Sequence, residues 1–255
     1  EQVGTGDFET KLENYNILEF QQISDSFNEM TVRIETLIKE VYETQLLVKE
    51  ARLQYLQAQI NPHFMFNVLT MIAIKVKKHR DEELYQTVTS FAGLMRGKLF
   101  RRNEVEIKLK EEMEIAGFYL YLQSERFKDI ITYNIEWESD EIKECYVPRL
   151  CIEPIVENAV IHGLEPKGTE GRIRVAIREA SEDSINIVVE DDGVGFNVNE
   201  MDDRKDNKNP RVGVMNIQRL IRNLYGDKYG VLFQSEIGKG TIVTVCLPMR
   251  KDRTV

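Results

Sequence analysis

A histidine placed directly after a proline is the residue of this chain that best suits nucleophilic chemistry. The stretch reads Gln59-Ile60-Asn61-Pro62-His63-Phe64-Met65-Phe66-Asn67, and His63 is one of 3 histidines in 255 residues. An imidazole of near-neutral pKa can attack without first losing a tightly held proton. Asn67 follows four residues later and would share a helix face with His63. A packed or solvated helical histidine is the alternative, and spacing alone does not exclude it.

Four short motifs that suit a bound nucleotide follow in a fixed order in the C-terminal half. They are Glu157-Asn158-Ala159-Val160-Ile161-His162-Gly163, Asp191-Asp192-Gly193-Val194-Gly195-Phe196, Gly213-Val214-Met215-Asn216 and Gly238-Lys239-Gly240-Thr241. Each one alone is ordinary turn chemistry, because Asp-Gly and Gly-x-Gly pairs are common in turns. Their joint occurrence in this order predicts one nucleotide pocket.

The residue types in these motifs fit adenine, phosphate and magnesium. A carboxylate at Asp191 would accept a hydrogen bond from the exocyclic amino group of adenine, whereas guanine would present a carbonyl there. Gly193 and Gly195 would let the backbone approach the base without a Cβ. Gly213 would open a helix whose free N–H groups suit phosphate oxygens. Asn158 would supply a neutral oxygen ligand for Mg²⁺, which keeps water and phosphate oxygens as its other partners.

Helices must position His63. An apolar stripe recurs in steps of four and three between Ile23 and Ala58, which predicts a coiled coil and therefore an oligomer, although a single amphipathic helix explains part of it. Pro62 should bend the helix just before His63. The basic tract 77–81 predicts a turn, followed by helices over about Glu82–Phe100 and Leu109–Arg126.

The C-terminal half contains segments in which apolar and polar residues alternate, as in strands, and segments with helical periodicity. This pattern predicts an α+β domain with a mixed sheet covered by helices on one face. The strands are expected at Ile131–Trp137, Arg172–Ile177, Ser184–Glu190, Val231–Ser235 and Thr241–Leu247, and the helices at about Cys151–His162 and Gly213–Tyr225. The polar stretch 200–210 is either a lid or a surface loop, and its place between two glycine motifs favours a lid.

Composition narrows the class of protein. A net charge of -9 argues against a general nucleic-acid binder, whose affinity comes from phosphate neutralisation. The 3 cysteines lack metal-site spacing and indicate a reducing compartment. The sequence contains neither a long apolar run nor a signal-peptide pattern. It begins without methionine, so we expect the soluble part of a longer protein.

The four C-terminal motifs resemble the GHKL (Bergerat) ATP-binding fold shared by histidine kinases, type II topoisomerases and mismatch-repair ATPases. The stretch around His63, with Glu-Asn-Ala and His-Gly downstream, resembles LytS/YesM-type sensor histidine kinases. Residues 25–30 look like part of a HAMP signal-relay module. The resemblance implies an α + α/β multidomain chain: a HAMP remnant and coiled coil over 1–48, a helical phosphoacceptor domain forming a dimeric four-helix bundle over 49–127, and an α/β-sandwich ATP-binding domain over 128–250.

Carried over residue by residue, the resemblance makes His63 the phosphoacceptor and Asn158 the Mg²⁺ ligand, with Asp191 and Thr241 holding adenine. The implied ATP-binding set also includes His162, Gly163, Gly193, Gly195, Gly213, Asn216, Lys239 and Gly240. Two positions depart from the family's usual pattern. Met65 replaces a frequent leucine, which conserves volume. Ile161 replaces a frequent lysine, which removes one phosphate contact.

The implied activity is that of an ATP-dependent protein-histidine kinase of a two-component system. It would autophosphorylate His63 and pass the phosphoryl group to an aspartate of a response regulator. The implied cofactors are ATP and Mg²⁺, and the implied partners are a second copy of the chain and the regulator's receiver domain, with no nucleic acid. The chain would work on the cytoplasmic side of a bacterial membrane, anchored by segments outside this sequence.

Two other classes compete with this interpretation: a GHKL ATPase that hydrolyses ATP, and a non-catalytic nucleotide-binding scaffold. Hydrolysing relatives resemble one another in an acidic residue one turn before the motif asparagine, and that position is Pro154 here. Many histidine kinases carry an acid directly after the histidine, where this chain has Phe64, so Asn61 or Gln59 would have to orient the imidazole. We hypothesise that Asn67 positions water for dephosphorylating the regulator.

Overall fold

The computed structural model describes residues 26–42, 44–45, 48, 62–99, 104–128, 130–181, 183–197 and 210–253. It divides into two units, residues 1–61 and 62–255. In the first unit residues 26–42 are helical, and Met30, Leu37 and Val41 of the expected seam are exposed. Residues 1–25, 43, 46–47 and 49–61, which make up the rest of the expected HAMP remnant and coil, lie outside the described residues, as does the 200–209 stretch. None of the described helices is long and apolar enough to cross a bilayer.

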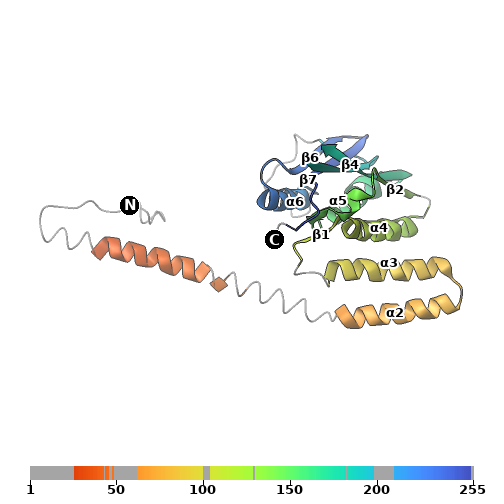
Figure 1. Ribbon diagram of the computed structural model, residues 1–255, viewed down its shortest axis with the longest axis horizontal. Helices are drawn as coiled ribbons and strands as arrows, with labels where there is room; N and C mark the ends of the chain where they lie inside the picture. Colours follow the sequence, from red (N-terminus) through yellow and green to blue (C-terminus); the bar gives the residue numbers. More distant parts are fainter. Residues whose placement is uncertain are drawn as a thin grey trace, which may run out of the picture. The chain divides into compact units, whose positions relative to one another are not determined.

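The second unit begins with an antiparallel helical hairpin (Figure 1). Helix α2 spans Pro62–Lys78 and helix α3 spans Glu82–Leu99. Between them Arg80 is left-handed with φ 58, and the Asp81 carboxylate accepts a hydrogen bond from the Leu84 N–H at 3.0 Å, which caps α3. The predicted turn and return helix are confirmed. The bend expected before His63 is not testable, because residues 49–61 lie outside the described part.

A five-stranded mixed sheet forms the base of the nucleotide domain. Its order is β2-β4-β5-β7-β6, with β2 and β4 parallel and the other pairs antiparallel. The strands are β2 Ile131–Trp137, β4 Gly171–Ser181, β5 Ser184–Asp191, β6 Gly230–Glu236 and β7 Gly240–Pro248. All five predicted strands are therefore present. A second pair, β1 Glu106–Lys108 with β3 Tyr146–Pro148, was not predicted, because three residues are too short to show alternation.

Helices cover one face of this sheet (Figure 1). They are α4 Leu109–Arg126, α5 Glu153–Asn158 and α6 Pro210–Tyr225, with short turns η2 Glu141–Glu144, η3 Ala159–Leu164 and η4 Glu165–Lys167. Helix α4 buries Leu109, Met113, Ala116 and Leu120 in the same core as the sheet. Helix α4 therefore packs into the core beneath the sheet, and the expected domain boundary at 127/128 lies just after this helix.

Helix α3 packs closely against α4 along two glycines. A Cβ added to Gly93 would lie 2.4 Å from the Phe118 ring, and one added to Gly97 would lie 2.5 Å from Ile115. Two glycines four residues apart lie on one helix face, so they form a shallow groove that accepts these side chains. The hairpin and helix α4 therefore meet at a surface where a larger residue at either position would force Phe118 or Ile115 to shift.

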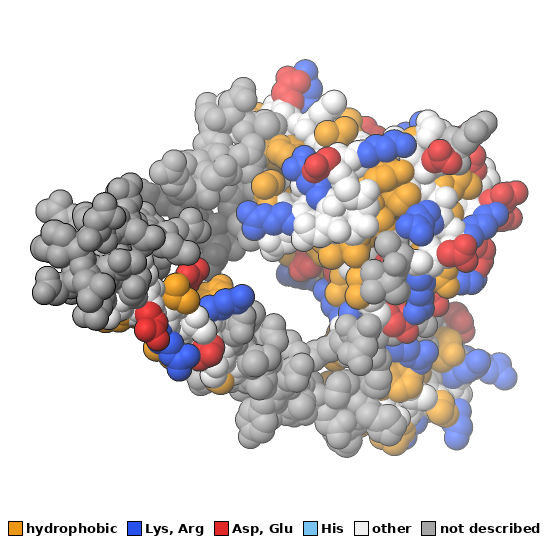
Figure 2. Space-filling model, turned by 60° about the vertical axis from the view of Figure 1, so that its left-hand side comes forward, with side chains coloured by type: hydrophobic (Ala, Val, Ile, Leu, Met, Phe, Trp, Pro, Cys, Tyr) orange, Lys and Arg blue, Asp and Glu red, His pale blue; other side chains and the backbone are white. Residues whose placement is uncertain are grey.

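Polar contacts close the end of the same α3 surface. The Arg149 guanidinium donates hydrogen bonds to the carbonyl oxygens of Gly97 at 2.6 Å and Lys98 at 2.8 Å. The Lys98 ammonium pairs with Glu153 at 2.7 Å. Because Glu153 begins α5, this ion pair links the end of the hairpin to the helix that carries Asn158. The surface shown in Figure 2 mixes acidic and basic side chains with hydrophobic ones.

Candidate functional site

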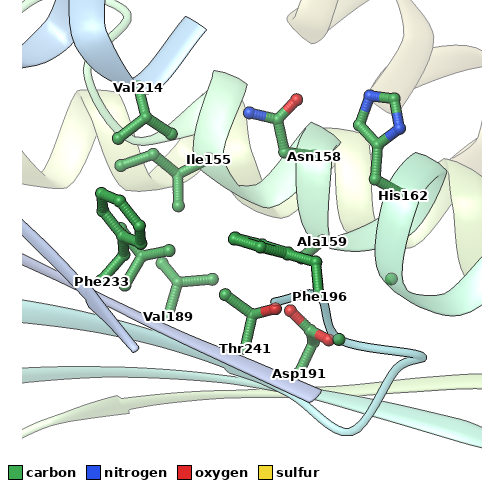
Figure 3. Close-up of a pocket in the computed structure, with 13 residues that line it drawn as sticks. Ile155, Asn158, Ala159, His162, Val189, Asp191, Phe196, Val214, Phe233 and Thr241 are labelled. Carbon is green, nitrogen blue, oxygen red and sulfur yellow. The ribbon is translucent and has the colours of Figure 1, made fainter. Parts of the chain in front are cut away.

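A pocket lies between the α5–η3 helical segment and the sheet (Figure 3). Its walls are mostly apolar, and its polar side chains are Asn158, His162, Asp191 and Thr241. Among the described residues that line it, Asp191 is the only acid. The complete lining is Ile155, Asn158, Ala159, His162, Gly163, Val189, Asp191, Gly195, Phe196, Val214, Phe233, Thr241 and Val243. An apolar pocket with one buried carboxylate suits a flat base that donates a hydrogen bond.

Asp191 ends β5 and is only 6% exposed. Its Oδ1 accepts a hydrogen bond from the Gly193 N–H at 2.9 Å, and Thr241 lies opposite it in the β5–β7 register. Burial raises the pKa of the Asp191 carboxyl to about 6, while the hydrogen bonds from the backbone N–H groups of Gly193 and Thr241 act in the opposite direction. At neutral pH the group is therefore mostly ionised and can accept a hydrogen bond.

Glycines let backbone segments meet around this carboxylate. A Cβ on Gly193 would lie 2.4 Å from the Gly163 carbonyl, and one on Gly195, whose φ is 59, would lie 2.0 Å from the Glu236 oxygen. A Cβ on Gly240, whose φ is 102, would lie 2.0 Å from the backbone carbonyl oxygen of Asp191. Gly193 and Gly195 were expected to let the backbone approach the base closely. In the structure their space is taken instead by neighbouring backbone, which fixes the turn after Asp191.

Asn158 ends α5 and faces the first turn of α6. A Cβ added to Gly213 would lie 3.5 Å from the Asn158 Nδ2 atom. Helix α6 begins at Pro210, three residues before the expected start at Gly213, because proline is favoured at the first helical position. Gly213 is the fourth residue of α6, so its N–H is the first that pairs within the helix, and the unpaired N–H groups precede it. The start of α6, through Val214, and the Asn158 amide lie at the same side of the pocket (Figure 3).

Five of the expected ATP-binding residues do not line the pocket: Gly193, Gly213, Asn216, Lys239 and Gly240. Asn216 is exposed on α6 and does not line it. Lys239 is 71% exposed and pairs with Glu236 at 2.7 Å. His162 is exposed at the rim, as Figure 3 shows. The apolar lining was not predicted, since residues such as Ile155 and Val243 look like ordinary core positions in sequence.

His63 lies in the first turn of α2, and its side chain is outside the described part of the chain. Asn67 lies one turn further and is exposed. Opposite this part of α2, the Arg96 guanidinium of α3 lies 4.3 Å from the centre of the Phe66 ring. None of the described residues that line the nucleotide pocket belongs to α2, so the two expected centres of chemistry lie on different elements.

The acids nearest to Asn158 along α5 face the hairpin. Glu153 pairs with Lys98, and its side chain is only 3% exposed. Burial raises the pKa of the Glu153 carboxyl, while Lys98 opposes the shift. Glu157 lies 3.9 Å from the same lysine. Neither acid lines the pocket, and Pro154 occupies the first turn of α5.

Two family models match the chain. The model described as "Histidine kinase" matches residues 51–131, and the one described as "Histidine kinase-, DNA gyrase B-, and HSP90-like ATPase" matches residues 148–251. Strands β4 to β7, helices α5 and α6 and the pocket with Asp191 lie within the second match, whereas helices α2, α3 and α4 lie within the first. The fold and site therefore define a histidine kinase region joined to a GHKL-type ATP-binding domain.

Curated relatives narrow the family. The chain is 33% identical over 228 residues to sensor histidine kinase YesM of Bacillus subtilis, covering 89% of this chain and 38% of that protein. It is 29% identical to sensor histidine kinase YpdA of Escherichia coli, covering 81% and 37%, and 28% identical to sensor protein LytS of Oceanobacillus iheyensis, covering 85% and 37%. The chain thus spans less than two-fifths of the length of these relatives. It belongs to the LytS/YesM-type sensor histidine kinases.

Proposed function

We propose that this chain is the kinase part of a two-component sensor, which uses ATP to phosphorylate His63 and then passes the phosphoryl group to an aspartate of a response regulator. The observation that carries the proposal is the Asp191 carboxylate, buried at the base of an apolar pocket and fixed by the backbone N–H of Gly193 at 2.9 Å. An ionised acceptor in this place selects a base with an amino group over one with a carbonyl.

The pocket residues divide by the part of ATP that they would bind. Asp191 and Thr241 would hold the adenine edge, since both lie at the sheet side of the pocket (Figure 3). The first turn of α6, which contains Gly213, and His162 would face the phosphates at the rim. Asn158 would bind Mg²⁺ through its side-chain oxygen, and the metal would neutralise phosphate charge. Lys239 would reach the phosphates only after leaving Glu236.

Transfer to a protein nucleophile fits the site better than hydrolysis. Water attack requires a base near the γ-phosphate, but Glu153 is buried against Lys98 and Pro154 has no titratable group. His63 can accept the phosphoryl group without a strong base, because an imidazole is a nucleophile at neutral pH. The γ-phosphoryl group of ATP would therefore be transferred to His63 rather than to water.

A direct experiment separates transfer from hydrolysis. The chain is incubated with Mg²⁺ and γ-labelled ATP, and protein-bound label is compared with released inorganic phosphate over the first turnover. We expect label on the protein to exceed free phosphate. A faster release of phosphate than labelling would identify a hydrolysing GHKL ATPase, and binding with neither product would identify a scaffold.

The partners that we propose are a second copy of the chain and the receiver domain of a response regulator. Met65 and Ile72 on α2 and Leu84 and Phe91 on α3 are apolar and exposed. Packing two hairpins into a four-helix bundle would bury these side chains. The whole protein, of which this chain covers a part, would act at the cytoplasmic side of a bacterial membrane.

Asn67 is proposed to position water for removing the phosphoryl group from the regulator. It is exposed one turn after His63, so it can face a docked receiver domain. Asn67→Ala should slow dephosphorylation of the phosphorylated regulator roughly tenfold or more, as for loss of one positioning group, while labelling of His63 stays normal. Unchanged dephosphorylation in this variant would remove Asn67 from that role.

A further inference from the structure

Phe196 points its ring into the nucleotide pocket. In Figure 3 the ring lies between Ile155 and Asn158 on the helical side and Thr241 and Asp191 on the sheet side. It follows the second glycine motif directly, so its backbone position is fixed by the turn described above. Its own N–H donates to the Ser235 Oγ at 2.9 Å.

Little cavity volume remains around the Phe196 ring, between the α5–η3 segment and the sheet. It lies 6.4 Å from the Phe233 ring, measured between centroids, and Phe233 is also part of the wall. The cavity volume that remains is about 60 Å³. Pockets that bind drug-sized ligands typically measure roughly 300–1,000 Å³. With Phe196 in this place, the pocket has room for a few water molecules but not for a purine.

An adenine that donates to Asp191 must lie in the layer that Phe196 fills. The acceptor oxygens are within the pocket, and the ring of Phe196 lies beside them (Figure 3). Two aromatic rings cannot share this volume, because the helical wall and the sheet are packed with buried residues such as Val189. Either the base does not bind here, or Phe196 moves out when it binds.

We propose that Phe196 is a displaceable plug of the base site, which competes with the adenine ring and thereby sets the affinity for ATP. The inference rests on the proposed function, because it takes the base to be adenine held by Asp191. Phe196 is half-buried rather than fully enclosed, so its side chain is not locked into the core. The plugged conformation is incompetent for binding, and the observed affinity falls in proportion to its population.

The test measures binding of ATP, adenosine and inorganic tripolyphosphate to the whole chain by calorimetry, with and without Phe196→Ala. We expect Phe196→Ala to tighten ATP and adenosine by the same factor, about tenfold, equivalent to about 1.4 kcal/mol. Tripolyphosphate has no base and should bind both proteins equally. Weaker or unchanged binding of ATP to Phe196→Ala would overturn the plug, since the ring would then stack on the base or lie elsewhere.

A leucine variant and a fluorescent variant keep the test informative if Phe196→Ala folds poorly. Phe196→Leu leaves a smaller side chain and should tighten ATP by an intermediate factor. Phe196→Trp, made with Trp137→Phe because Trp137 is the only tryptophan among 255 residues, reports the position of the ring directly. Its emission should shift to longer wavelength when adenosine binds. An unchanged or blue-shifted emission would show that the ring stays buried and would overturn the plug.

Asp191→Asn distinguishes failure of the plug from failure of the proposed function. If Asp191→Asn weakens ATP binding but Phe196→Ala does not tighten it, the adenine site stands and only the plug is wrong. If neither variant changes ATP affinity, the base lies outside this pocket and both proposals fail.

Discussion

In the proposed ATP site, the Asp191 carboxylate would favour binding of the base while it lowers the stability of the fold. Its burial would allow it to select a base, since water would otherwise satisfy it. The same burial raises its pKa to about 6, so the folded protein holds an ionised group at a cost when the pH is neutral. The buried carboxylate would therefore favour nucleotide binding and lower the free energy of unfolding.

The contribution of the Asp191 carboxylate to ATP affinity is tested by Asp191→Asn. An amide keeps the size of the side chain but replaces the charged acceptor, so ATP binding should weaken by roughly 1–3 kcal/mol. Titration calorimetry on the wild-type chain and the variant measures the difference. Equal affinities would place adenine elsewhere. Asp192→Asn, at the exposed neighbouring position, is a matched control and should leave the affinity unchanged.

The effect of the Asp191 carboxylate on stability is tested by the pH dependence of the free energy of unfolding. The Asp191 pKa is about 6 in the folded protein against 3.8 for the ordinary group, so the folded state binds more protons between these values. Stability from this residue is thus lost as the pH rises from about 4 to about 6. Asp191→Asn should raise the free energy of unfolding by roughly 1–3 kcal/mol above pH 7. Urea titrations should show this gap closing toward pH 4, and a gap independent of pH would contradict the account.

At the scale of elements, the contact between α3 and α4 connects the two expected centres of chemistry. The Gly93–Gly97 groove receives Phe118 and Ile115, and Lys98 extends the contact to Glu153 of α5. Phe66, three residues after His63, packs on Arg96 of the same helix end. The end of α3 therefore touches both the turn after His63 and the helix that ends at Asn158.

Gly97→Ala tests the groove. A Cβ would lie 2.5 Å from Ile115, and such overpacking costs roughly 1–3 kcal/mol, against a gain of up to about 1 kcal/mol from better helix propensity. We expect a net loss of about 1 kcal/mol in the free energy of unfolding. Gly117→Ala on α4 is the matched control, because its Cβ would have 3.8 Å of clearance and should stabilise the protein. Equal effects of the two changes in urea titrations would show that α3 and α4 do not pack as described.

The sequence was sufficient to predict the elements that bury an alternating or helical apolar face. Strand β2 and helix α4 begin and end at the predicted residues, since their patterns run through their full length. The β1–β3 pair was missed because its order comes from tertiary contacts. Phe196 could not have been recognised as pocket-filling, because only the folded turn shows where its ring points. The contact between Gly97 and Ile115 is likewise invisible without the packing.

At the scale of the whole molecule, a helical hairpin that carries the proposed phosphoacceptor is joined to a domain that carries the proposed ATP pocket. The family matches cover both parts, residues 51–131 and 148–251. The hairpin is antiparallel and carries exposed apolar side chains, as a dimerising bundle requires. Without His63 the pocket would only bind ATP, and without the pocket His63 would be an ordinary helical histidine.

Phosphorylation of His63 by ATP is tested most directly by labelling the chain with γ-labelled ATP, followed by acid treatment. We predict that the wild-type chain and His79→Ala, at the turn between α2 and α3, incorporate label that is lost in acid and kept in alkali, as expected of a phosphorylated imidazole. His63→Ala should incorporate none while binding ATP normally. Acid-labile label retained on His63→Ala would contradict the assignment of the phosphoacceptor.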